Sequence, residues 1–97
     1  MPGLLKITFT AEVIYWRGPA PFYYLKVPLK FVPEMKKIAP KITFGWGMLP
    51  ADCESQGVEF YTALFPKDGT YYLPLRKDLR EKLKIELGDR VKVTANF

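Results

Sequence analysis

Residues 71–93, YYLPLRKDLREKLKIELGDRVKV, decide the fold. Leu75, Leu79 and Leu83 recur every four residues and would line one face of a short helix. Gly88 tolerates the left-handed conformation that ends helices, so the helix is expected to stop just before it. After Gly88 apolar and polar residues alternate, which is typical of a strand with one buried face. The stretch therefore predicts a strand, a helix, a tight turn and a second strand.

The rest of the chain adds mainly strands. Alternating or apolar segments predict strands over residues 5–13, 22–27, 41–48, 50–54, 58–65, 70–75 and 90–97. Residues 58–65 are apolar on both faces and are expected to be buried on both sides, whereas residues 51–55 are poor in β-branched side chains and predict an irregular hairpin arm. A second short helix is expected over residues 31–38, with Pro40 blocking its continuation. Together these elements predict an all-β fold: a single-chain double-split β-barrel, capped by two short helices, with residues 1–97 as one domain.

Composition narrows the class of protein. The chain has 97 residues, of which 48% are hydrophobic, so it can bury one core. Its single cysteine excludes an internal disulfide, and no apolar run is long enough for a signal peptide or a membrane helix. We therefore expect a soluble cytoplasmic protein without a membrane partner. The net charge of +5 permits binding to nucleic acid or acidic partners, although basic residues spread along a chain also form ordinary solvated surface.

The polar residues are biased toward lysine and glutamate. Asn, Gln and Ser occur once each, at Asn96, Gln56 and Ser55, and His is absent. Depletion of thermolabile amides is typical of thermophiles. The composition thus predicts a thermophilic source and an unfolding temperature above about 90 °C.

Several short motifs resemble a known family. The motifs are Gly45-Trp46-Gly47-Met48-Leu49-Pro50, Leu64-Phe65-Pro66-Lys67, Tyr72-Leu73-Pro74-Leu75 and Gly88-Asp89. Together they are similar to a small family of archaeal and bacterial proteins of unknown function, and the resemblance runs from Phe9 to Val93. It implies a double-split β-barrel, which in bacteria is often fused ahead of a bacteriocin-protection-like domain.

The C-terminal motif also resembles the half-barrels of AbrB-, MazE- and MraZ-type proteins. The AbrB and MazE types bind DNA as dimers and are about half as long as this chain, so each barrel needs two chains. This chain is expected to hold enough strands to close a barrel alone. We therefore expect a monomer, and DNA binding is the less favoured reading.

No catalytic set is evident. Without histidine, the usual proton shuttle near neutral pH and the commonest metal ligand are missing. Cys53 lies between Asp52 and Glu54, which would raise its pKa, so a buried structural thiol is the favoured interpretation. Gly45 and Gly47 lack the third glycine and the following helix of a dinucleotide fingerprint. We therefore expect a protein that is not an enzyme and has neither cofactor nor metal.

Binding is the remaining class of function. Aromatic rings near basic side chains suit a small or acidic ligand, held in a cleft where the barrel splits. The candidate contacts are Trp16, Arg17, Trp46 and Tyr72. The competing interpretation is that these rings simply fill or rim the barrel.

The alternative function is AbrB-like binding of nucleic acid. Its candidate phosphate contacts are the basic residues of the predicted helix and last strand: Arg76, Arg80, Lys84, Arg90 and Lys92. Asp78, Glu81 and Glu86 dilute this charge, so a solvated helix face explains it with fewer assumptions.

Overall fold

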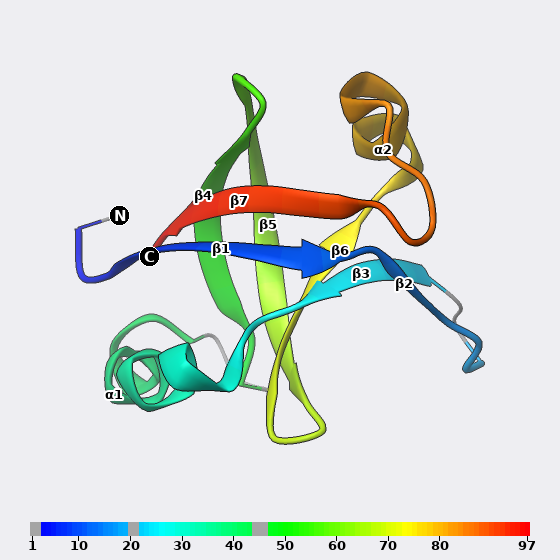
Figure 1. The fold of residues 1–97 in the computed structure, drawn as a ribbon. Coiled ribbons are helices and arrows are strands. Elements are labelled where there is room, and N and C mark those ends of the chain that lie inside the picture. The colour runs from blue at the N-terminus through cyan, green and yellow to red at the C-terminus, as the bar shows by residue number, and fades with distance from the viewer. Residues whose placement is uncertain (1–2, 20–21, 44–46) are drawn as a thin grey trace.

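The computed structural model describes residues 3–19, 22–43 and 47–97. These residues are mainly β, as the sequence predicts, and they form seven strands and two short α-helices (Figure 1). The elements in chain order are β1 (Lys6–Glu12), β2 (Ile14–Trp16), β3 (Phe22–Lys26), a 3-10 turn η1 (Leu29–Phe31), α1 (Val32–Ile42), β4 (Leu49–Ser55), β5 (Val58–Lys67), β6 (Thr70–Leu75), α2 (Lys77–Leu83) and β7 (Arg90–Asn96).

The strands form one antiparallel sheet that curls into a half-barrel. Their order is β1-β7-β4-β5-β6-β3-β2. The two outermost strands, β1 and β2, are separated in sequence by Val13 alone, so the curl brings the two ends of the sheet together at this residue. Val13 is fully buried, its N–H donates to the Asp89 carbonyl (2.8 Å) and its carbonyl accepts from the Gly88 N–H (3.0 Å).

β5 belongs to both halves of the sheet. Its residues 58–64 pair with β4, and its last three residues pair with β6. The turns that flank it, Gln56-Gly57 and Asp68-Gly69, have positive φ at each residue, which suits two-residue hairpins.

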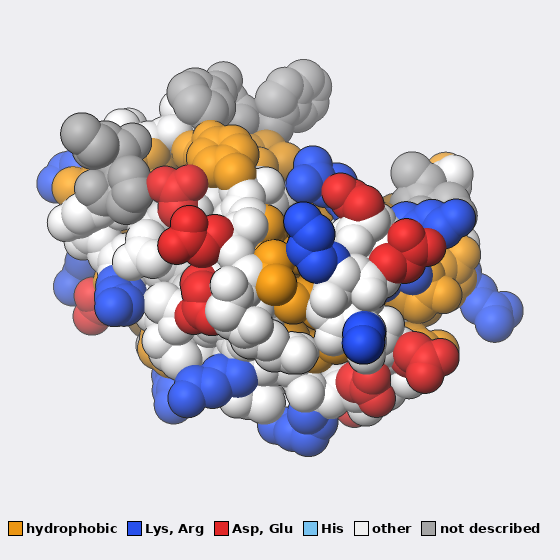
Figure 2. Space-filling view, turned by 90° about the horizontal axis from the view of Figure 1, so that it is seen from above, with side chains coloured by type: hydrophobic (Ala, Val, Ile, Leu, Met, Phe, Trp, Pro, Cys, Tyr) orange, Lys and Arg blue, Asp and Glu red, His pale blue; other side chains and the backbone are white. Residues whose placement is uncertain are grey.

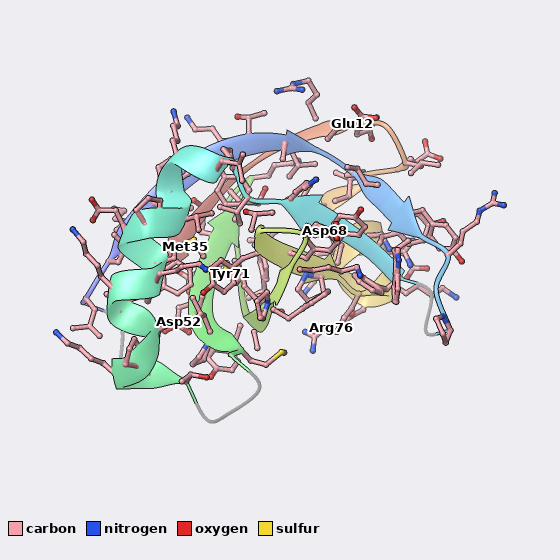
Figure 3. All side chains as sticks on the ribbon, turned by 90° about the horizontal axis from the view of Figure 1, so that it is seen from below. Glu12, Met35, Asp52, Asp68, Tyr71 and Arg76 are labelled. Atoms are coloured by element: carbon pink, nitrogen blue, oxygen red, sulfur yellow. The ribbon has the colours of Figure 1, made fainter. Side chains whose placement is uncertain are left out.

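The two short helices that the sequence predicts both pack on the core. α1 buries Met35 and Ile38 in the main core, and α2 buries Leu79 and Leu83 there. Figure 3 shows Met35 pointing from α1 into the interior beside Tyr71. The two helices lie at opposite corners of the sheet (Figure 1).

The prediction that Pro40 blocks the first helix is wrong. α1 runs through Pro40 to Ile42, and the Thr43 N–H closes it on the Ala39 carbonyl (2.9 Å). Pro40 lies in the last turn of the helix and has no N–H, so one backbone hydrogen bond to the Lys36 carbonyl is missing. Because Lys36 is exposed, water can hydrogen-bond to that carbonyl instead. The strand predicted over residues 41–48 is also wrong for every described residue of that range. Lys41 and Ile42 are helical, Gly47 lies in a turn, and Thr43 and Met48 belong to no strand, while residues 44–46 lie outside the described part of the chain.

The second helix is shorter than predicted. α2 ends at Leu83 because Lys84 adopts the left-handed conformation (φ 56°). The Ile85 N–H donates to the Arg80 carbonyl and the Lys84 N–H to the Glu81 carbonyl, which is a Schellman arrangement with lysine in place of glycine. Gly88 (φ 91°) serves the following turn instead. Leu75, which was predicted to lie on the apolar face of this helix, is instead the last residue of β6, and the helix begins at Lys77.

Two predictions about the β4–β5 hairpin are also wrong. β4 is regular, since it pairs residue by residue with β5 from Leu49 to Ser55. β5 is not buried on both faces, because Tyr61 is 59% exposed and Glu59 is also exposed. Val58 and Phe60 pack on the core, so Tyr61 lies on the outer face of the curled sheet.

Surface charges are mixed in sign. Figure 2 shows Lys and Arg side chains interspersed with Asp and Glu on the face seen from above. Within the described ranges the only ion pair is that of Arg76 with Asp78 (3.8 Å), and both side chains are exposed. The thermophile hypothesis thus gains no support from an ion-pair network. Among the described helices, none is long and apolar enough to cross a membrane.

We predict that α1 seals the core through Met35. Met35→Ala should lower the free energy of unfolding by about 2–5 kcal/mol, because Met35 is fully buried. Lys36→Ala, at the exposed neighbouring position, should change it by less than about 0.5 kcal/mol. Urea unfolding measures both values, and equal effects of the two substitutions would contradict this role of α1.

We also predict a loss of stability at alkaline pH. Burial, with a smaller contribution from the charge of Asp52, raises the pKa of the Cys53 thiol from 9.0 to about 12. The thiol therefore stays neutral in the folded chain but ionises in the unfolded chain. Its contribution to the free energy of unfolding is complete below pH 9 and is lost as the pH rises. The loss should be about 1 kcal/mol between pH 9 and pH 10. Burial also raises the pKa values of Tyr71 and Tyr72, which adds a decline of the same sign.

Urea unfolding at several pH values, with Cys53→Ala as the comparison, separates these contributions. The variant should show a shallower decline than the wild type. Identical slopes would contradict the assignment to Cys53.

Candidate functional site

The β2–β3 hairpin presents aromatic rings on both of its faces. Tyr15 pairs with Tyr23, and Trp16 pairs with Phe22. Because neighbouring residues of a strand point to opposite faces, the two pairs lie on opposite sides of the sheet. The Tyr15 and Tyr23 rings pack with their centroids 4.8 Å apart.

Arg80 of α2 is held against the Tyr15–Tyr23 side. Its guanidinium carbon lies 3.9 Å from the centroid of the Tyr23 ring, and its Nε–H donates to the Leu75 carbonyl (3.1 Å). Leu75 pairs with Tyr23 across β3 and β6, so one short stretch of the sheet positions both contacts. A guanidinium stacked in this way keeps its charge and gains a cation–π attraction.

The terminal amino groups of Arg80 remain unpaired. No hydrogen bond from them and no carboxylate within ion-pair distance is found among the described residues. A guanidinium presents these donors in a fixed fork that matches a carboxylate or a phosphate. Arg80 is therefore fixed in place by Tyr23 and Leu75 while its anion-binding edge is unused.

A hollow of about 380 Å³ opens next to this guanidinium. We call it the Arg80 hollow; its lining residues are Tyr15, Phe22, Tyr23, Leu75, Arg76, Lys77 and Arg80. Three of these described lining residues are basic and none is acidic. The hollow thus combines flat rings with positive charge.

A second hollow that Arg80 also lines has a different charge. Its lining includes Tyr23 and Arg80 together with the acidic residues Glu86 and Asp89. The Asp89 carboxylate already accepts a hydrogen bond from the Glu86 N–H (2.8 Å). Arg80 therefore lines both a positively charged hollow and one with acidic residues, and an anion is favoured only in the first.

Of the predicted ligand contacts, Trp16 lies on the other face of the hairpin. The Trp16 ring packs edge-on against Phe22 (5.3 Å) and beneath the Lys67 ammonium (4.7 Å). It also covers Gly18, where an added Cβ would lie 2.1 Å from the indole. Arg17 is exposed. Trp46 lies outside the described residues.

Tyr72, the fourth predicted contact, is 2% exposed. Its ring stacks on Tyr24 at 4.0 Å, and its hydroxyl donates to the Asp68 carboxylate. Burial and this hydrogen bond raise the pKa of Tyr72 well above its usual range. Tyr72 and Trp16 belong to one aromatic cluster, because Phe22 contacts both Trp16 and Tyr24.

The five basic residues predicted for nucleic acid are only partly brought together. Arg76 and Arg80 line the Arg80 hollow, and Arg80 and Lys84 line a neighbouring depression with Glu81 and Glu86. On β7, Arg90 pairs with Glu12 and Lys92 pairs with Thr10. No described contact or hollow joins these two residues of β7 to the three from the α2 region.

Sequence reasoning missed Tyr15 and Lys77. Tyr15 was visible as a ring one residue before Trp16, but its pairing with Tyr23 depends on the register of the two strands, which the local sequence does not specify. Lys77 begins α2 and lines the hollow beside Arg76. The signal for it was the basic pair that opens the helix.

The described residues offer little for catalysis. Cys53 is 3% exposed and its pKa is raised to about 12, so its thiol is not a nucleophile at neutral pH. Across residues 3–19, 22–43 and 47–97, no group of His, Cys, Asp and Glu side chains is placed to hold a metal ion.

Comparison with known proteins gives one family. No curated protein matches the chain. A family profile, described as a domain of unknown function (DUF1905), matches residues 9–94, which is most of the sequence and all seven strands in whole or in part. The chain therefore belongs to the DUF1905 family.

Proposed function

We propose that the chain is a non-catalytic binding module for a small organic acid that carries a flat ring. The observation that supports it most strongly is the state of Arg80. Its guanidinium is fixed by the Tyr23 ring and the Leu75 carbonyl, yet its terminal donors are unused within the described structure. Fixing a donor before binding lowers the entropy cost of recognition.

The charge of the Arg80 hollow selects an anion. Arg76 and Lys77 line this hollow together with Arg80, whereas the acidic Glu86 and Asp89 line a different one. A carboxylate or phosphate would accept two parallel hydrogen bonds from Arg80. The same arrangement repels a cation.

The rings and the size of the hollow select the rest of the ligand. Tyr15 is 37% exposed and forms a ring surface with Tyr23 on which a flat group stacks. The volume of about 380 Å³ is at the lower end of small-molecule sites, which span about 300–1,000 Å³. A mononucleotide or an aromatic acid meets these conditions. Arg17 lies two residues after Tyr15 and is exposed, so it is a proposed contact for any part of a ligand that extends beyond the hollow, whereas Trp16 lies on the opposite face.

A second candidate is AbrB-like nucleic-acid binding. Arg76, Arg80 and Lys84 near α2 favour it, but Glu81 and Glu86 lie among them. Steep loss of oligonucleotide affinity between two salt concentrations would support it, and loss of that affinity in Arg90→Gln would extend the contact to β7.

The finer fold relation is also a proposal. β5 has two strand partners, and β1 continues through Val13 into β2 with a different partner. That each of these segments pairs with two different strands supports a double-split barrel completed by one chain. Such a protein would be a monomer, in contrast to the two-chain barrels of the AbrB type.

We predict that AMP stabilises the protein through Arg80. At about 100 times its Kd, AMP should raise the free energy of unfolding by about 2.7 kcal/mol. Inorganic phosphate should stabilise less, because it lacks a ring. Arg80→Lys should weaken AMP binding by at least about tenfold, since lysine keeps the charge but loses the stacked fork.

The matched control is Lys30→Gln. Lys30 also lies over an aromatic ring, that of Phe31 at 5.2 Å, but it does not line the Arg80 hollow. Its substitution should leave AMP binding unchanged when measured by calorimetry. Failure of AMP and of simple aromatic acids to bind the wild type at millimolar concentration would refute the proposed function.

A further inference from the structure

The first half of β5 has one edge that no described strand covers. Residues 58–64 pair with β4 on one side only, and β6 joins the other side at Phe65, Pro66 and Lys67. From Tyr72 onward β6 turns away to pair with β3. The side that β6 leaves is therefore open along the first half of β5.

The backbone groups on this open side belong to Glu59, Tyr61 and Ala63. In an antiparallel pair, alternate residues direct N–H and C=O toward the same neighbour. The two-residue turn makes Ser55 and Val58 a hydrogen-bonded pair, so Val58, Phe60, Thr62 and Leu64 bond to β4. The residues between them, Glu59, Tyr61 and Ala63, direct their N–H and C=O groups away from β4. This is the side on which Phe65 and Lys67 bond to β6.

A hollow of about 330 Å³ separates this open edge from α2. Its lining residues are Val58, Glu59, Phe60, Tyr61, Arg76, Asp78, Leu79 and Lys82. Tyr61 and Glu59 are exposed, so access from solvent is unobstructed on their side. A strand edge beside a helix is the setting in which an extended peptide adds to a sheet.

The charge of the hollow distinguishes a peptide from nucleic acid. Arg76 and Lys82 are balanced by Glu59 and Asp78. Such a balanced surface offers a phosphate chain no net attraction. It suits a neutral polypeptide backbone, with one acidic side chain placed near Lys82 and one basic side chain near Glu59.

We propose that an extended segment of a partner protein adds as a strand to β5 at Glu59, Tyr61 and Ala63. The segment has alternating apolar and polar side chains. Its apolar side chains face Phe60 and Leu79, and its polar side chains face solvent beside Tyr61. This interface is separate from the proposed ligand site, and the two share only Arg76.

Amide hydrogen exchange tests the proposal. The probe is a blocked peptide of alternating valine and threonine with a lysine at one end and a glutamate at the other. At saturation it should slow exchange of the Glu59, Tyr61 and Ala63 amides by at least about tenfold. The Phe60 and Thr62 amides, which bond to β4, should not change. The control peptide has the same side chains but a fully N-methylated backbone, and it should protect none of these amides.

Three results would overturn the proposal. The first is no protection by the probe at millimolar concentration, and the second is equal protection by the N-methylated peptide. The third is slow exchange of Tyr61 without peptide together with a doubled molecular mass, because a second copy of the chain would then cover the edge. Binding of AMP is measured separately, so a failure here leaves the proposed ligand function intact.

Discussion

The backbone bonds of Val13 are the constraint on which the structure depends. A single strand cannot pair with β7 along one half and β3 along the other unless it bends between them. Val13 is that bend, and it is fixed by its bonds to Asp89 and Gly88 and by complete burial of its side chain. A buried N–H or carbonyl without a partner would be costly, so these two bonds determine where the bend occurs. The loop between α2 and β7 thus joins the two ends of the sheet.

The same bend positions the candidate site. Tyr15 follows Val13 by two residues and meets Tyr23 across β2 and β3. Tyr23 in turn pairs with Leu75, the residue that ends β6 just before α2. Arg80 returns from the first turns of α2 to bond the Leu75 carbonyl and stack on Tyr23. The aromatic rings and the Arg80 guanidinium are therefore placed by elements from both ends of the chain, which accounts for the fixed geometry of this half-buried cation.

Local patterns in the sequence predicted much of the fold. The alternation in β1 and β7 and the apolar face of α2 formed by Leu79 and Leu83 depend on neighbours in sequence, and they are confirmed. The errors occur where a local rule meets tertiary context. Pro40 is tolerated because only one solvent-exposed hydrogen bond is lost, and Lys84 takes the conformation expected of a glycine. Tyr61 is exposed because no described element covers it on the outer face of β5. The site was harder still, since the pairing of Tyr15 with Tyr23 and the stacking of Arg80 depend on strand register and on the path of α2, neither of which the sequence pattern specifies.

Hydrogen exchange at Val13 tests the central claim most directly. If its backbone bonds hold the two ends of the sheet together, the Val13 amide should exchange only through global unfolding, with the same free energy as the amides in the middle of β7. Exchange of Val13 at the rate of an exposed loop, while β7 stays protected, would contradict the account. It would mean that the sheet persists without the bend, and that the rings and guanidinium of the candidate site are not fixed by it.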